Sequence, residues 1–206
     1  MIPSRLSQGE WKFLELQSSQ SFDHKRLFIV FTAHTGDFEL LAVVAATFGP
    51  NVTSLFRPPN NPYGAEQLSR FRRRRIGNLV PSHAGSAFAL ARQLDCGGGV
   101  GILVDQKFRK GLPTKFFGED VRTNPLLAKS VRQFDCDVFP ARCIRLPYNR
   151  FRLELEPKIK IPRNKQGAVD FQQTAQLLNV KLETWIRQYP EQWLWYHDRW
   201  DHRQKN

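Results

Sequence analysis

Apolar residues in this chain occur in short runs that alternate with longer stretches of helical periodicity. The short runs are rich in branched and aromatic residues, and they predict strands at 27–31, 51–56, 100–104, 138–144 and 151–156. The periodic stretches predict helices at 38–48, 60–76, 84–94, 124–134 and 168–188. Strands that alternate with helices, followed by a hairpin that turns at 147–150, predict a largely parallel mixed sheet flanked by helices.

The same pattern predicts a single α/β domain. A chain of 206 residues with 41% hydrophobic content is long enough to bury a sizeable core, and no repeat or linker divides residues 27–203. Residues 1–26 are mixed and polar, and we expect them to form a lead-in segment with one amphipathic turn around Trp11 and Leu14. The glycines and the proline of residues 111–118 predict a loop.

Polar side chains follow three of the predicted strands directly. His34 comes after strand 27–31, Arg57 after strand 51–56, and Asp105 and Gln106 after strand 100–104. Ligands of α/β sheets bind outside the carboxyl ends of the strands. We therefore expect these side chains to gather at one edge of the sheet, although Arg57 and Asp105 are equally compatible with a surface arginine and a turn cap.

His34 and Glu39 form a candidate pair for acid–base chemistry. On one continuous helix they would point about 140° apart, so they can meet only if His34 lies in the turn and Glu39 in the first helical turn. A carboxylate there would accept the imidazole N–H and support the charge that appears when the other nitrogen takes a proton. The alternative interpretation is a solvated Glu39 at a helix N-terminus, where the macrodipole favours it.

The charge of the chain indicates an anionic partner. The formal net charge is +12, and a basic run comprises Arg72, Arg73, Arg74 and Arg75. Only Phe71 lies near this run to stack on bases, so we expect a clamp for acidic lipid or protein and no nucleic acid. The three cysteines have neither disulfide nor metal-ligand spacing, and we expect no metal and no cofactor. Glu39 interrupts the best apolar run, so we expect a location in the cytosol or on a cytoplasmic membrane face.

The last stretch of the sequence is rich in aromatic residues. Trp193, Trp195 and Trp200 follow the predicted final helix, and we expect at least one of them to pack in the core. Amphipathic indoles also favour a membrane interface. Trp200, beside Arg199, Arg203 and Lys205, is the candidate for contact with lipid headgroups.

Five motifs then occur in one order along the chain. They are His34-Thr-Gly-Asp-Phe-Glu39, Phe56-Arg57-Pro58, Asp105-Gln106, Phe116-Phe117-Gly118, and Tyr189-Pro-Glu-Gln-Trp-Leu-Trp195 with His197. In this order the chain resembles the late acyltransferases of lipid A biosynthesis, which belong to the lysophospholipid acyltransferase superfamily. The resemblance extends over about residues 27–203.

The resemblance implies transfer of a fatty acyl group from acyl carrier protein to a hydroxyl of a Kdo-bearing lipid A precursor, at the cytoplasmic face of the inner membrane. It makes His34 the general base, Glu39 its partner, and Arg57, Asp105 and Gln106 substrate-site residues. The hydrophobic anchor usual in the family does not precede His34, so we expect peripheral attachment to the membrane. As a separate departure from the family pattern, Asp37 stands where many relatives have Asn.

Two other functions remain open at this stage. The same chemistry could use another glycolipid or a lysophospholipid as acceptor, because spacing does not reveal the acceptor pocket. A non-catalytic basic module that binds membrane or nucleic acid would need only an exposed basic face.

Overall fold

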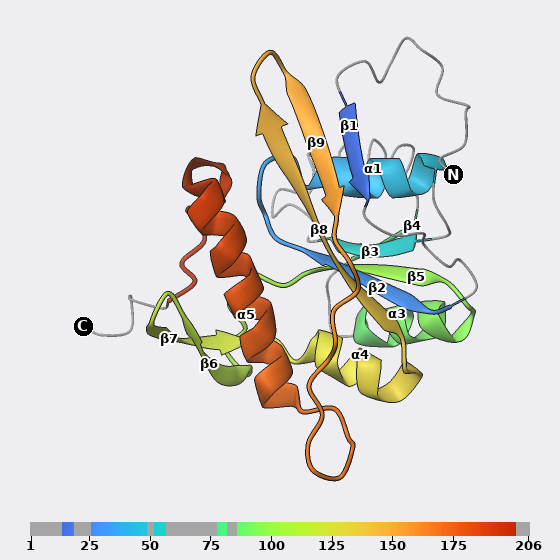
Figure 1. Cartoon of the computed structure of the whole chain (residues 1–206). Coiled ribbons are helices and arrows are strands. Elements are labelled where there is room, and N and C mark those ends of the chain that lie inside the picture. Colours follow the sequence, from blue (N-terminus) through green and yellow to red (C-terminus); the bar gives the residue numbers. More distant parts are fainter. Residues whose placement is uncertain (1–13, 19–25, 49–51, 57–77, 82–85, 201–206) are drawn as a thin grey trace.

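The computed structural model describes residues 14–18, 26–48, 52–56, 78–81 and 86–200 (Figure 1). Its centre is a seven-stranded sheet in the order β1-β9-β8-β2-β5-β3-β4. The strands are β1 (Leu14–Ser18), β2 (Phe28–Thr32), β3 (Val52–Phe56), β4 (Asn78–Pro81), β5 (Gly99–Leu103), β8 (Asp137–Leu146) and β9 (Arg150–Leu155). Neighbours pair in parallel except β8 and β9, which are antiparallel. The predicted single α/β domain with a largely parallel mixed sheet is confirmed.

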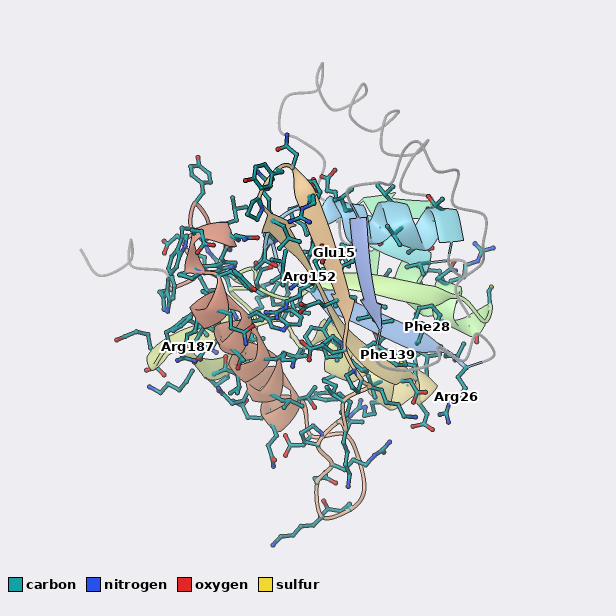
Figure 2. The ribbon with its side chains drawn as sticks, turned by 45° about the horizontal axis from the view of Figure 1, so that its top comes forward. Glu15, Arg26, Phe28, Phe139, Arg152 and Arg187 are labelled. Atoms are coloured by element: carbon teal, nitrogen blue, oxygen red, sulfur yellow. The ribbon has the colours of Figure 1, made fainter. Side chains whose placement is uncertain are left out.

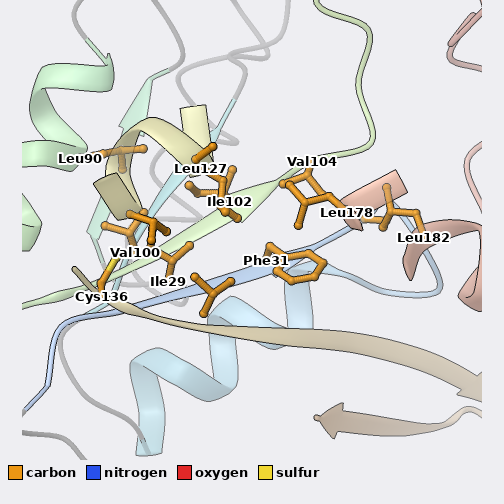
Figure 3. Close-up of a cluster of buried hydrophobic side chains, with 14 of the residues drawn as sticks. Ile29, Phe31, Leu90, Val100, Ile102, Val104, Leu127, Cys136, Leu178 and Leu182 are labelled. Atoms are coloured by element: carbon orange, nitrogen blue, oxygen red, sulfur yellow. The ribbon is translucent and has the colours of Figure 1, made fainter. Parts of the chain in front are cut away.

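Helices cover both faces of this sheet. They are α1 (Glu39–Phe48), α3 (Ser86–Asp95), α4 (Leu126–Phe134) and α5 (Phe171–Gln188). The connection from β2 through α1 to β3 crosses the sheet in one direction, and those through α3 and α4 cross in the other. Because such crossovers are right-handed, α1 lies on one face and α3 and α4 on the opposite face, as Figures 1 and 3 show.

The hydrophobic core lies between the central strands of the sheet and the helices α3, α4 and α5. Figure 3 shows Ile29 and Phe31 of β2 and Val100 and Ile102 of β5 together with side chains from these helices. Leu90, Leu127, Leu178 and Leu182 are each at most 2% exposed. Helix α5 contributes a buried apolar stripe to this core, and each of its leucines removes apolar surface from water.

The sheet has a topological switch point between β2 and β5. These strands are hydrogen-bonded neighbours, but β2 continues to β3 beyond β5, whereas β5 continues to β8 beyond β2. Connections that leave in opposite directions open a crevice at the carboxyl ends of the two strands, where α/β proteins bind ligands. The residues that follow β2 and β5 therefore form the first place to look for chemistry.

The structure corrects the prediction of a loop at 111–118. Residues Leu112–Phe116 and Glu119–Thr123 form a separate antiparallel hairpin, β6 and β7. Phe117 and Gly118 are its two turn residues and have positive φ angles of 52° and 84°, which a tight hairpin requires. Thr114, Phe116, Val121 and Thr123 are buried in alternation. The glycines and the proline signal the turn and the strand ends here, and they do not exclude strands.

Other elements also differ from the sequence prediction. Part of the predicted lead-in, Leu14–Ser18, is the edge strand β1, which pairs with β9 and is joined to it by the Glu15–Arg152 ion pair at 3.0 Å (Figure 2). Strand β4 was not predicted. Helix α5 begins at Phe171 instead of 168, because Asp170 caps it by accepting a hydrogen bond from the Gln173 backbone N–H. The predicted helix 60–76 lies outside the described residues.

Candidate active site

The turn that follows β2 carries His34 to the switch point. Ala33 is fully buried, and the Thr35 N–H donates to its carbonyl over 2.8 Å, which makes the turn tight. Gly36 has a φ of 57°, and a Cβ there would lie 2.3 Å from the Cys143 carbonyl oxygen of β8. Only glycine fits this position, so packing against β8 fixes the backbone of the turn.

Asp105 holds His34 from the end of the neighbouring strand. The Asp105 Oδ1 lies 2.8 Å from Nδ1 of the imidazole, and Oδ2 accepts the backbone N–H of His34 over 2.9 Å. Both side chains are shielded from water, at 12% and 4% exposed. The predicted gathering of His34 and Asp105 at the carboxyl ends of strands is therefore present, and parallel pairing of β2 with β5 produces it.

The surroundings of Asp105 favour its ionised form. Burial alone would raise the pKa of the Asp105 carboxyl, but hydrogen bonds and charge from His34, together with a hydrogen bond from Trp193, outweigh it and lower that pKa. An ionised Asp105 can only accept, so Nδ1 of His34 carries a proton, and the tautomer of the ring is the one that leaves Nε2 to face Gln106.

The Nε2 side of His34 borders Gln106 and Phe38. The amide nitrogen of Gln106, which is an exposed residue, lies 3.4 Å from Nε2, a long contact for a hydrogen bond. The ring of Phe38 packs edge-on against the imidazole, with centroids 4.6 Å apart. Nε2 can therefore exchange its weak contact with Gln106 for a hydrogen bond from a substrate hydroxyl.

Glu39 stands in the first turn of α1, as the sequence predicted, although the helix begins at Glu39 itself and not at Phe38. The role that the sequence assigned to it, accepting the proton of the imidazole ring, is filled at Nδ1 by Asp105. The part that Glu39 takes in the reaction stays a prediction. Sequence spacing pointed to Glu39 because that residue is near in the chain, whereas Asp105 comes from another strand.

A segment near the end of the described chain closes over both turns. We name residues Gln192–Arg199 the closing segment. Its Gln192 carbonyl accepts from the Gly36 N–H over 2.9 Å, and its Leu194 N–H donates to the His34 carbonyl over 2.9 Å. The indole N–H of Trp193 donates to Asp105 Oδ2 over 3.0 Å. A core position was predicted for at least one of the tryptophans, and Trp193 takes it at 3% exposed, but its bond to Asp105 was not predicted.

His197 in the closing segment holds the loop after β5. Its Nε2 accepts from the Lys107 backbone N–H over 2.8 Å. Burial lowers the pKa of His197, and the positive charges of Arg199 and Lys107 add to this effect against the opposing pull of Asp105. The neutral imidazole is the form that can accept this hydrogen bond, so pKa and geometry agree. No sequence signal pointed to this partner.

Arg199 ties the closing segment to the hairpin and to α5. It is fully buried, and its guanidinium donates to the carbonyls of Gln106 and Arg122 and to the side chains of Thr123 and Asn179. Burial lowers its pKa to about 10, which leaves it charged at neutral pH. The sequence placed Arg199 beside Trp200 at lipid headgroups. That placement is wrong for Arg199, because its buried guanidinium donates its hydrogen bonds to acceptors inside the protein.

The other predicted site residues are less informative. Arg57, Arg72, Arg73, Arg74 and Arg75 lie outside the described residues. Trp200 is partly buried, donates to the Phe116 carbonyl and stacks on Trp195.

Within the described ranges, no cluster of three or more His, Cys, Asp or Glu side chains is placed to hold a metal ion. None of the helices described is both long and apolar enough to span a bilayer.

A largely buried His–Asp pair thus lies at the switch point of a largely parallel sheet, the place where α/β folds bind their ligands. The model of the bacterial lipid A biosynthesis acyltransferases matches residues 8–202. The chain belongs to this family, which supports acyltransferase activity in lipid A biosynthesis. A comparison with curated proteins found no match.

Proposed function

We propose that this protein transfers a fatty acyl group from the thioester of acyl carrier protein to a hydroxyl of a Kdo-bearing lipid A precursor. The observation that carries the proposal is the hydrogen-bonded His34, whose Nδ1 is held by Asp105 while Nε2 faces the exposed Gln106. Family membership supplies the reaction class. The donor and the acceptor are our inference from the five motifs of the sequence.

The chemistry proceeds by direct transfer. Nε2 of His34 takes the proton of the acceptor hydroxyl as its oxygen attacks the thioester carbonyl carbon. The tetrahedral intermediate then collapses, the carbon–sulfur bond breaks, and the departing thiolate receives the proton from His34. Asp105 stabilises the imidazolium between these steps, through the 2.8 Å contact at Nδ1.

A covalent acyl-enzyme is not required. The buried Cys136 and Cys143 have thiol pKa values raised by burial to about 12 and about 11, so neither supplies a thiolate at neutral pH. Holding both substrates together in one crevice gives the rate advantage without a nucleophilic side chain.

Several groups would stabilise the oxyanion and the substrate charges. Arg57, or backbone N–H groups at the start of α1, would face the developing oxyanion. Glu39, in the first turn of α1, would add a second negative charge beside the imidazolium. Gln106 would contact the acceptor hydroxyl or the thioester, because its amide already borders Nε2.

The partners follow from the charge of the chain. A net charge of +12 favours the acidic carrier protein and an anionic glycolipid. We propose that Arg72, Arg73, Arg74 and Arg75 clamp these anionic groups at the cytoplasmic face of the inner membrane, where the protein binds peripherally.

One reconstitution tests the proposal. The purified protein is incubated with acyl carrier protein thioester and a Kdo-lipid A precursor, and mass spectrometry follows addition of one acyl chain. The His34→Ala variant is the control for uncatalysed transfer. Transfer to a lysophospholipid alone would assign the alternative acceptor, and tight binding of both substrates without transfer would favour the non-catalytic basic module.

A further inference from the structure

Asp105, which holds His34, is itself held by a third residue, Trp193. Oδ2 accepts two hydrogen bonds, one from the His34 backbone N–H over 2.9 Å and one from the Trp193 indole over 3.0 Å. Hydrogen bonds to a carboxylate are stronger than those between neutral groups. The indole is thus one of two donors that hold Oδ2 and compensate part of the carboxylate charge away from the imidazole ring.

The position of Trp193 is itself fixed by packing. Its ring meets Phe116 and Trp200 edge-on, with centroids 5.8 and 5.9 Å away. Its backbone forms an isolated β-bridge with Thr35, the residue that follows His34. At 3% exposed, the indole N–H is shielded from water and would be left unpaired without Asp105.

We infer that Trp193 is a positioning residue of the acyl transfer: its indole N–H holds Oδ2 of Asp105 and takes up part of the carboxylate charge that faces His34. This role rests on the proposed function for its effect on rate. The link from Trp193 through Asp105 to His34 is a property of the folded protein and can be measured without substrate.

The direction of the effect follows from electrostatics. Without the indole donor, the charge of Asp105 is compensated less, so the carboxylate attracts the imidazolium more strongly. His34 then releases its proton at a higher pH, and the neutral base is scarcer at a given pH. The rate falls because fewer molecules hold a base that is ready to react.

Other charged groups also face this pair. His197 and Arg199 approach from the closing segment, and Lys107, in the loop after β5, acts on His197. Asp37 and Glu39 lie on the chain that leads from His34 into α1. A substitution at Trp193 changes none of these side chains, so their contributions are common to the variant and the unaltered protein.

The test compares Trp193→Phe with Trp195→Phe. Phenylalanine keeps an aromatic ring but removes the indole N–H. Trp195 lies two residues further on and donates its indole N–H to the Pro190 carbonyl over 2.7 Å, so the control also loses a hydrogen bond of the same segment. We expect Trp193→Phe to lower kcat about 3- to 10-fold near neutral pH and to move the acid limb of the rate profile up by about 0.5–1 pH unit, with KM little changed. We expect Trp195→Phe to leave the acid limb in place.

A second readout does not depend on activity. Nuclear magnetic resonance follows the His34 ring as pH changes, and its titration midpoint should be higher in Trp193→Phe than in the unaltered protein or in Trp195→Phe. Equal midpoints in all three would overturn the inference. A shifted midpoint in a protein that transfers no acyl group would support the link and refute only the proposed function.

The inference can also be tested if Trp193→Phe does not fold. In the unaltered protein, the Trp193 indole N–H resonance should change with pH and share the midpoint of the His34 ring, because both groups bind one carboxylate. An indole resonance that stays constant while His34 titrates would overturn the inference.

Discussion

Asp105 accepts both the imidazole N–H and the backbone N–H of His34, over 2.8 and 2.9 Å. One carboxylate thus fixes the tautomer of the ring and the path of the turn that carries it. Because Asp105 comes from β5 and His34 from β2, the pairing of these two strands sets the geometry of the site.

Removal of the base should abolish most of the activity. We expect His34→Ala to lower the rate of acyl transfer by ~10²–10⁴-fold, the usual contribution of a positioned base, with little loss of substrate binding. Single-turnover transfer and equilibrium binding of the carrier-protein thioester measure the two effects. Undiminished turnover would remove the base assignment, and an acylated protein trapped without acceptor would indicate a covalent route.

The two candidate carboxylates should differ in importance. Asp105→Asn removes the charge that contacts Nδ1 and puts an amide where only an acceptor fits, so we expect kcat to fall ~10²–10³-fold. Glu39→Gln should cost less, about 10-fold or below, because Asp105 still orients the ring. Both variants are assayed at one pH under saturating substrates. A larger loss in Glu39→Gln would restore Glu39 as the principal partner of His34.

Gly36 should tolerate no side chain. An alanine Cβ would lie 2.3 Å from the Cys143 carbonyl oxygen, at a φ of 57° that side chains disfavour. We expect Gly36→Ala to lower the free energy of unfolding by about 2–4 kcal/mol and to reduce activity further by moving the His34 turn.

Gly97→Ala is the matched control for this substitution. Gly97 has a φ of 80°, but no atom lies within 4 Å of the position that an alanine Cβ would take there. The variant should lose about 1–2 kcal/mol from backbone strain alone and keep full activity. Urea unfolding and the transfer assay separate the clash from the strain, and equal losses in both variants would contradict the assigned clash.

His197 should make stability depend on pH. Its pKa is lowered in the folded state from an ordinary value of 6.5, so the unfolded chain takes up a proton first as the pH falls. The contribution of neutral His197 to the free energy of unfolding is fully present above pH 6.5. It is lost as the pH falls from that value toward the pKa of the folded state. Urea unfolding measured from about pH 7.5 to about pH 5 gives the free energy of unfolding as a function of pH. This dependence should be shallower in His197→Gln, because glutamine can accept from the Lys107 N–H without titrating. An unchanged slope would exclude His197 as the source.

Binding to membranes should be electrostatic. Without Arg72, Arg73, Arg74 and Arg75, replaced together by Gln, the protein should lose ~1 kcal/mol of affinity for anionic vesicles per charge near the surface. Binding of the unaltered protein should weaken steeply as salt is added. Sedimentation with anionic and neutral vesicles measures this. Equal partitioning onto both kinds of vesicle at all salt concentrations would exclude the electrostatic account.

Much of the fold follows from local pattern in the sequence. Strand β2, helix α1 and the stripe on α5 were predictable because each depends on periodicity within a few turns or on a run of apolar residues. The β6–β7 hairpin was not, since Gly118 indicates a turn without identifying the partner of each strand. Strand β1 was missed because its pairing with β9 joins residues distant in the chain.

The candidate site likewise has a part that the sequence could predict and a part that it could not. His34 and Asp105 could be placed at strand ends, since parallel strands bring their carboxyl ends to one edge. Their direct contact depends on which strands are neighbours, and the contacts of Trp193 and Arg199 depend on how the closing segment folds back. Spacing along the chain contains neither piece of information, so it pointed to Glu39 instead of Asp105 as the partner of His34.

The closing segment also imposes an order on the synthesis of a working site. A ribosome makes His34 and Asp105 well before residues 192–199, at about 5–20 residues per second. Until those residues emerge, the turn after β2 lacks the hydrogen bonds of Gly36 and His34 to the closing segment, and Asp105 lacks its indole donor. We therefore expect a nascent chain to form its central strands early and to complete the contacts around His34 and Asp105 only after translation has passed Arg199.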